Sequence, residues 1–137
     1  MSGSSPSSPQ PDAQERRLIL IVDDEPSVRA MVNASIDVRR SHYRVLEAGT
    51  AAEALALAHT EQPRLVLLDV ALPDHDGFWV CRLLKTTPST AHIPVIMLTA
   101  MSLASDRDQA TAAGADGYIV KPFSPRALLA ELDRRLA

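Results

Sequence analysis

The sequence has one cysteine, no long apolar run and no excess of positive charge, and each feature narrows the range of functions. Cys81 has no partner for an internal disulfide, and no cysteine and histidine cluster has the spacing of a zinc site. The apolar runs are far shorter than the ~20 residues of a membrane-spanning helix, and no secretory signal pattern opens the chain. The net charge of −3 argues against nucleic acid as the main partner. We therefore expect a cytoplasmic protein that binds neither membranes nor nucleic acid directly.

The composition indicates one globular domain with a tail. The chain has 137 residues, of which 46% are hydrophobic and 23% charged, which suits a single domain of ordinary composition. Residues 1–15 hold five serines and three prolines but no large apolar residue after Met1, so they cannot bury enough surface to offset the entropy of ordering. We predict a disordered tail over 1–15 and a folded domain over 16–137. A docking or phosphorylated arm is the alternative for the tail.

Short apolar runs alternate with helical patterns along the rest of the chain. Four of the five runs lack polar alternation, which is typical of parallel strands covered on both faces, and the second run, which contains Arg44, looks like an edge strand. The predicted strands are 18–22, 43–46, 65–68, 94–98 and 118–120. The predicted helices are 26–36, 51–59, 77–86, 102–113 and 125–136. This order predicts a doubly wound α/β sandwich with five parallel strands and five helices.

Polar side chains lie at the ends of four predicted strands, where open parallel sheets gather their function. The first strand ends in Asp23 and Asp24, the third in Asp69, the fourth in Thr99 and the fifth in Lys121 and Pro122. Each of these residues also has an ordinary structural explanation. Asp23 and Asp24 could cap the first helix, and Asp69 could be a turn residue. Thr99 could be a β-branched strand residue, and Lys121 a solvated surface charge. Together, however, the three carboxylates would repel one another unless a hard divalent cation bound them.

The motifs at these strand ends resemble those of response-regulator receiver domains of two-component systems. The matching segments are 22–26 (VDDEP), 67–77 (LLDVALPDHDG), 96–100 (IMLTA), 114–118 (GADGY) and 120–123 (VKPF). The resemblance covers roughly residues 17–137, with the motifs in the family's order. It implies a flavodoxin-like fold with strand order 2-1-3-4-5.

The resemblance also implies a role for each acidic residue. Asp69 would be the nucleophile that accepts a phosphoryl group and becomes an acyl phosphate. Asp24 and Asp69 would bind Mg²⁺ directly, and Asp23 would bind it directly or through water. The third protein ligand in the family is a backbone carbonyl, here that of Ala71, and a backbone ligand tolerates any side chain.

The remaining motif residues would contact the phosphoryl group and couple phosphorylation to a conformational change. Thr99 and Lys121 would each contact a phosphoryl oxygen, and the Lys121–Pro122 bond is commonly cis in the family. Tyr118 matches an aromatic switch position that responds with Thr99, although a half-buried tyrosine on an edge strand is the alternative. The face formed by the fourth helix, fifth strand and fifth helix would then carry the signal and support weak self-association.

The implied function is a phosphorylation-dependent switch rather than an enzyme acting on a separate substrate. Its phosphodonor would be a histidine kinase or a histidine phosphotransfer protein, and its target a downstream protein, whether the chain is a single-domain regulator or part of a longer protein. An aspartate-nucleophile phosphohydrolase is one alternative, but it would need an acid at Ala71; a receiver-like module that takes no phosphate is another. Because neither Ala71 nor Met101 offers a strong acceptor to water, we also predict slow dephosphorylation.

Overall fold

The computed structural model describes residues 17–37, 43–100 and 104–136, which form five strands and five helices in alternation. The strands are β1 (Arg17–Val22), β2 (Tyr43–Ala48), β3 (Leu65–Asp69), β4 (Val95–Thr99) and β5 (Gly117–Val120). The helices are α1 (Pro26–Asp37), α2 (Ala51–Glu61), α3 (Gly77–Thr86), α4 (Ala104–Ala112) and α5 (Pro125–Leu136). The predicted tail, Met101 and the predicted start of the fourth helix lie outside the described residues.

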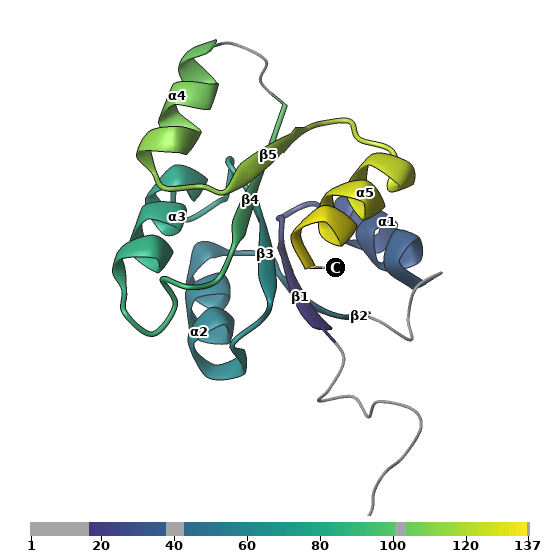
Figure 1. Cartoon of the computed structure of the whole chain (residues 1–137), viewed down its shortest axis with the longest axis horizontal. Helices are drawn as coiled ribbons and strands as arrows, with labels where there is room; N and C mark the ends of the chain where they lie inside the picture. Colours follow the sequence, from purple (N-terminus) through teal and green to yellow (C-terminus); the bar gives the residue numbers. More distant parts are fainter. Residues whose placement is uncertain (1–16, 38–42, 101–103, 137) are drawn as a thin grey trace, which may run out of the picture.

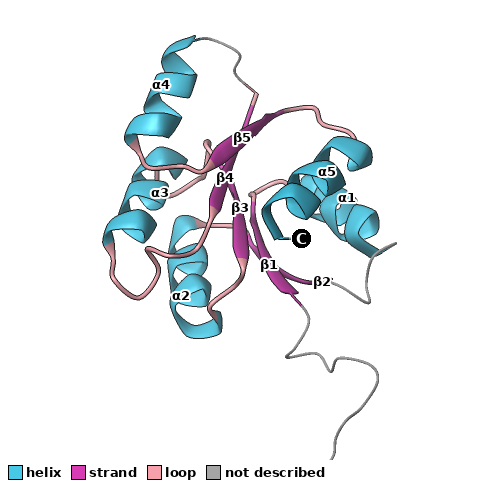
Figure 2. Cartoon of the chain, viewed as in Figure 1, coloured by secondary structure: helices cyan, strands magenta, loops and turns pink. Residues whose placement is uncertain are grey.

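The five strands form one parallel sheet in the order β2-β1-β3-β4-β5, as predicted (Figure 1). The strand that contains Arg44 is at one edge, which confirms its assignment as an edge strand. Helices α1 and α5 cover one face of the sheet and α2, α3 and α4 cover the other (Figure 2). Among the described residues, none of the helices has the length and hydropathy of a membrane-spanning segment.

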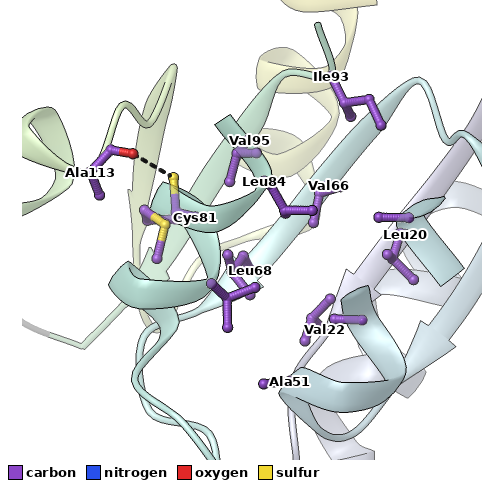
Figure 3. Packing of buried hydrophobic residues seen from close by; sticks show 14 of the residues in the cluster. Leu20, Val22, Ala51, Val66, Leu68, Cys81, Leu84, Ile93, Val95 and Ala113 are labelled. Atoms are coloured by element: carbon purple, nitrogen blue, oxygen red, sulfur yellow. Dashed lines mark hydrogen bonds between the residues drawn. The ribbon is translucent and has the colours of Figure 1, made fainter. Parts of the chain in front are cut away.

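The core consists of two apolar layers, one on each face of the sheet. Successive residues of β1 face opposite layers: Ile19 and Ile21 pack with α1 and α5, whereas Leu20 and Val22 pack towards α2 and α3. Both layers are covered by helices, so both faces of the strand must be apolar, which explains the absence of polar alternation. Figure 3 shows the second layer, where Cys81 is buried and its thiol donates to the carbonyl of Ala113 at 3.5 Å.

Local sequence signals determine where the helices begin. At α2 the Thr50 hydroxyl accepts the N–H of Glu53 at 3.1 Å, which is the first half of the predicted capping box. The Glu53 carboxylate accepts the N–H of Gly49 at 2.8 Å, one residue before the N-cap, rather than that of Thr50. At α5 the Ser124 hydroxyl accepts the N–H of Ala127 at 3.0 Å. These caps satisfy N–H groups that have no partner within the helix, and they fix where the chain leaves the sheet.

Most boundaries differ from the predictions by one or two residues. Strands β3 and β4 end at Asp69 and Thr99, the residues predicted at these strand ends. Strand β4 begins after Pro94, which has no N–H to donate to the ladder, although its carbonyl accepts the N–H of Val66 at 2.9 Å.

Candidate functional site

The parallel sheet brings the carboxyl ends of its central strands to one edge. Asp23 directly follows β1, and the register pairs Val22 with Leu68, the residue before Asp69. The register also pairs Asp69 with Leu98, the residue before Thr99. The strand order reverses direction at β1 and β3, and a crevice at such a switch point is where open α/β sheets bind ligands.

Five of the predicted site residues line one cavity of about 420 Å³. The residues that line it are Asp24, Glu25, Asp69, Val70, Ala71, Thr99, Ala100 and Lys121. Asp23 is fully buried and lies behind this lining, whereas Asp24 is exposed to solvent. The structure therefore brings together the residues that the strand-end motifs had singled out.

Lys121 connects the acidic residues of the site. Its Nζ lies 2.6 Å from Oδ2 of Asp23, 3.3 Å from Oδ1 of Asp69 and 3.7 Å from Oε1 of Glu25. Burial disfavours the charged ammonium, but the hydrogen bond to Asp23 and the charges of Asp69 and Asp23 outweigh it and raise the pKa of Lys121. The Lys121–Pro122 bond is cis, as predicted. The side chain therefore carries a fixed positive charge into the cavity.

Asp69 is buried among charges of both signs. Burial and the neighbouring charge of Asp23 raise the pKa of Asp69 above its ordinary value, while Lys121 and the N–H of Ala71, which donates to Oδ1 at 3.3 Å, oppose this rise. Keeping Asp69 ionised in this position therefore costs free energy, and a second cation beside Lys121 would reduce that cost. Its oxygen faces a cavity that also contains a hydroxyl and an ammonium, so the site can hold a tetrahedral anion against a carboxylate.

Asp23, Asp24 and Asp69 can each offer a carboxylate oxygen, and these oxygens lie within 4.8 Å of one another. Hard oxygen ligands of this kind suit Mg²⁺, which is held in proteins by one or two carboxylates together with phosphate and water. The pKa of Asp69 is raised mainly by burial and then by the charge of Asp23, and a bound divalent cation would oppose both effects. The donor set therefore fits a divalent cation.

Arg29 contributes to the site without having been singled out from the sequence, and Glu25, part of the 22–26 motif, was given no role of its own. The Nη1 of Arg29 donates to the carbonyl oxygen of Asp23 at 2.6 Å, and its Nε contacts Glu47 on β2 at 2.9 Å. The N–H of Glu25 donates to Oδ1 of Asp23 at 2.9 Å. These bonds fix the turn that carries Asp23 and Asp24. A hydrogen bond to a main-chain atom cannot be recognised from the side chains in a sequence. The one sequence feature that could have indicated a role for Arg29 is its position one helical turn after Glu25.

Gly77 allows α3 to begin directly against the end of β3. A Cβ atom at this position would lie 2.1 Å from the carbonyl oxygen of Asp69 and 2.8 Å from Cα of Val70. The Gly77 N–H donates to the carbonyl of Val70 at 2.7 Å. The sequence placed Gly77 only at the start of a helix, whereas the structure gives it a packing role beside the site.

Tyr118 lies on β5 with its side chain 36% exposed, and the guanidinium of Arg107 on α4 is 5.6 Å from its ring centroid. Val120, two residues further along the same edge strand, is 40% exposed. The ring thus lies on the outer surface, beside α4, in a position that suits either a switch residue or the alternative of an ordinary edge-strand tyrosine.

Comparisons with known proteins identify the family of this chain and agree with its fold. A family model for the response regulator receiver domain matches residues 19–133. The DNA-binding dual master transcriptional regulator RpaA of Synechocystis sp. is 42% identical over 114 residues, which are 83% of this chain and 46% of that protein. The chemotaxis response regulator CheY4 of Vibrio cholerae has a TM-score of 0.81 at 32% identity, covering 88% of this chain and 99% of that chain.

A further solved structure with a similar fold is a receiver domain that holds a metal ion. The receiver domain of the sensor histidine kinase PA1611 from Pseudomonas aeruginosa, with a magnesium ion coordinated in its active site cleft, has a TM-score of 0.79 at 29% identity, covering 88% of this chain and 97% of that chain. The chain spans about half the length of the curated relatives it matches. Since the family model matches most of its residues, this chain belongs to the response regulator receiver domain family.

Proposed function

We propose that this chain is a phosphorylation-dependent switch in which Asp69 accepts a phosphoryl group with the help of Mg²⁺. The observation that carries the proposal is the position of Lys121, whose Nζ lies within 3.3 Å of both Asp23 and Asp69 at a cavity that Thr99 also lines. The receiver domain of this proposal spans residues 16–137, and residues 1–15 are the tail.

In the proposed reaction, an oxygen of the Asp69 carboxylate attacks the phosphorus of a phosphohistidine. The P–O bond of an acyl phosphate forms, the P–N bond breaks, and the imidazole leaves with the electron pair of that bond. Lys121 and the Thr99 hydroxyl contact the phosphoryl oxygens, and positioning and charge stabilisation supply most of the catalysis. Bound Mg²⁺ would supply further positive charge beside the transferring group. Asp24 would bind it together with Asp69, Asp23 directly or through water, and the carbonyl of Ala71 would be the backbone ligand.

The chain would catalyse only its own phosphorylation and dephosphorylation. An enzyme of the phosphohydrolase type needs a second acidic side chain two residues after the nucleophile, and Ala71 occupies that position at the cavity. The donor would be a histidine kinase or a histidine phosphotransfer protein. We assign the chain a protein target rather than DNA, because its net charge is −3. A cytoplasmic location remains a prediction from the sequence.

The output would pass through Thr99 and Tyr118 to the face formed by α4, β5 and α5. The exposed Tyr118 and Val120 support this choice, because apolar side chains on an edge strand favour contact with another protein. We include weak, phosphorylation-dependent self-association through this face in the proposal. Transfer of labelled phosphate from purified histidine kinases of the same host tests the function directly, and no transfer from any of them, nor from a small phosphodonor, would refute it.

Mg²⁺ should raise the thermal stability of the chain, because a ligand that binds only the folded state stabilises it. At a free concentration 100 times the dissociation constant the gain is ~2.7 kcal/mol. A gain of that size corresponds to a rise in melting temperature of about 10 °C for a domain of this size. Differential scanning fluorimetry with and without a chelator measures the shift.

A pair of variants makes the stabilisation experiment specific. Asp24→Asn removes one carboxylate of the cluster and should abolish most of the shift, whereas Asp108→Asn removes an exposed carboxylate of α4 and should leave it intact. An undiminished shift in Asp24→Asn would mean that Mg²⁺ binds elsewhere.

The phosphorylated chain should lose its phosphoryl group slowly. The side chains that orient the attacking water in the family lie at positions 71 and 101, and here they are Ala71 and Met101, of which Met101 lies outside the described residues. Positioned base or orienting groups typically contribute ~10²-fold or more. The double substitution Ala71→Asn with Met101→Glu should therefore accelerate decay of the purified phosphoprotein. Decay of the parent at the same rate or faster would contradict this explanation.

A further inference from the structure

The loop between β3 and α3 is attached at its outer end to a different helix. One oxygen of the Asp74 carboxylate accepts the N–H of Ala51 at 2.8 Å, and the other accepts the N–H of Ala52 at 3.1 Å. Both amides belong to the first turn of α2, more than twenty residues earlier in the sequence. Asp74 therefore joins the loop that follows Asp69 to the N-terminus of α2.

This attachment satisfies donors that α2 cannot satisfy itself. The Thr50 hydroxyl accepts the N–H of Glu53, the third residue of the helix, but the first two N–H groups have no acceptor within the helix. Asp74 supplies both acceptors, and its negative charge lies at the positive end of the helix dipole. The hydrogen bond from Ala51, followed by that from Ala52, lowers the pKa of Asp74, so the carboxylate is ionised at neutral pH.

The inner end of the same loop is held at the phosphoacceptor candidate. The N–H of Ala71 donates to Oδ1 of Asp69 at 3.3 Å, and Ala71 forms an antiparallel bridge with Asp76. Asp76 in turn caps α3, where its Oδ1 accepts the N–H of Phe78 at 2.7 Å. Leu72 packs against the core layer on this face. The main chain at Ala71 therefore lies in a loop that is held at several points. Among the described residues, Asp74 supplies the hydrogen bonds that join this loop to α2.

We infer that Asp74 is a positioning residue for the metal site, because it holds the loop whose Ala71 carbonyl is the predicted backbone ligand of Mg²⁺. The inference rests on the proposed function. Without the link to α2, the loop would sample more conformations, and metal binding would have to order it. Residues that orient metal ligands from behind typically change metal affinity by 10–100-fold when they are removed. Asp74 contacts neither the cavity nor the acidic cluster, so its effect would be indirect.

The test is a Mg²⁺ titration of the full chain, followed by the fluorescence of Trp79. This is the only tryptophan of the sequence, and its ring stacks on His75, the neighbour of Asp74, with centroids 4.3 Å apart. The midpoint for Asp74→Ala should be about 10-fold higher than for the parent. Asp74→Asn, which retains one acceptor oxygen for Ala51, should fall between the two.

Thr50→Ala is the matched control, because it removes the other cap of the same helix without touching the loop. Its stability should fall, while its Mg²⁺ midpoint stays within twofold of the parent. Labelling of Asp74→Ala by acetyl phosphate should be slow at low Mg²⁺ and recover at saturating Mg²⁺, which a general loss of structure would not do.

Two outcomes would overturn the positioning role. One is a parental Mg²⁺ midpoint in Asp74→Ala, and the other is an equal rise in Thr50→Ala, which would indicate general loosening of α2. If the parent itself binds no Mg²⁺, the proposed function fails. If the parent binds Mg²⁺ and Asp74→Ala binds it equally well, only the positioning role fails.

Discussion

Asp69→Asn is expected to abolish phosphorylation and to leave the metal-free chain as stable as the parent or more stable. The substitution removes the nucleophilic oxygen without changing the shape of the side chain. It also removes a negative charge that burial and Asp23 disfavour, as the raised pKa of Asp69 indicates. Lys121 keeps its shorter contact, the 2.6 Å bond to Asp23. Loss of activity without loss of stability separates a functional carboxylate from a structural one.

The pH dependence follows from the same shift. A carboxyl group whose pKa is raised in the folded state favours folding when protonated, so its stabilising contribution is complete below the unfolded pKa of 3.8 and is lost as the pH rises through the folded value. The stability advantage of Asp69→Asn over the parent should therefore be larger at neutral pH than at acidic pH. Chemical denaturation in the presence of a chelator measures it.

Intact-protein mass spectrometry after incubation with acetyl phosphate and Mg²⁺ measures the labelling. Asp108→Asn is the control, because it removes a carboxylate that is exposed on α4 and lies outside the cluster. The parent and the control should be labelled, and Asp69→Asn should not. Labelling of Asp69→Asn at the parental level would show that another residue accepts the phosphoryl group.

Gly77→Ala is expected to destabilise the fold by about 2–3 kcal/mol, because the added methyl group would overlap main-chain atoms that cannot move independently. The nearest atom is the carbonyl oxygen of Asp69, at 2.1 Å from the position of the new Cβ. Relief of this overlap requires α3 to move away from the end of β3, which would also displace the Asp69 side chain. The labelling rate should therefore fall together with the stability.

Gly49→Ala provides the comparison for this effect. A Cβ at position 49 would lie 3.4 Å from Arg29 and 3.7 Å from Glu53, and both neighbours are ends of flexible side chains. Its stability should stay within ~0.5 kcal/mol of the parent. Urea denaturation of the two variants gives the difference, and similar stabilities for Gly77→Ala and Gly49→Ala would refute the close-packing account.

The sequence was sufficient for the fold because its signals are local or periodic. Strands such as β1 are apolar on both faces, which indicates a sheet covered by helices on each side, and the Thr50–Glu53 pair marks the start of a helix. The alternation of such strands with helices then limits the topology to few choices. The positions of Asp23, Asp69 and Lys121 at strand ends gave the candidate site for the same reason.

Hydrogen bonds between residues far apart in the sequence could not be predicted where one partner is a main-chain atom. The hydrogen bonds from Ala51 and Ala52 to Asp74 join residues more than twenty positions apart, and their donors are backbone N–H groups. No pattern of side chains in the sequence therefore predicts them. The bond from Arg29 to the carbonyl of Asp23 is of the same kind. The packing of Gly77 against Asp69 depends on how closely α3 approaches β3, which only the three-dimensional arrangement determines.

The most direct test of the account is to locate the phosphoryl group on the parent chain. The chain is incubated with acetyl phosphate and Mg²⁺, the acyl phosphate is trapped by reduction with borohydride, and the modified residue is identified by peptide mapping. We expect a single modified position, Asp69, and no modification when Mg²⁺ is chelated. Modification of Asp23 or Asp24 instead, or no acyl phosphate at all, would contradict it.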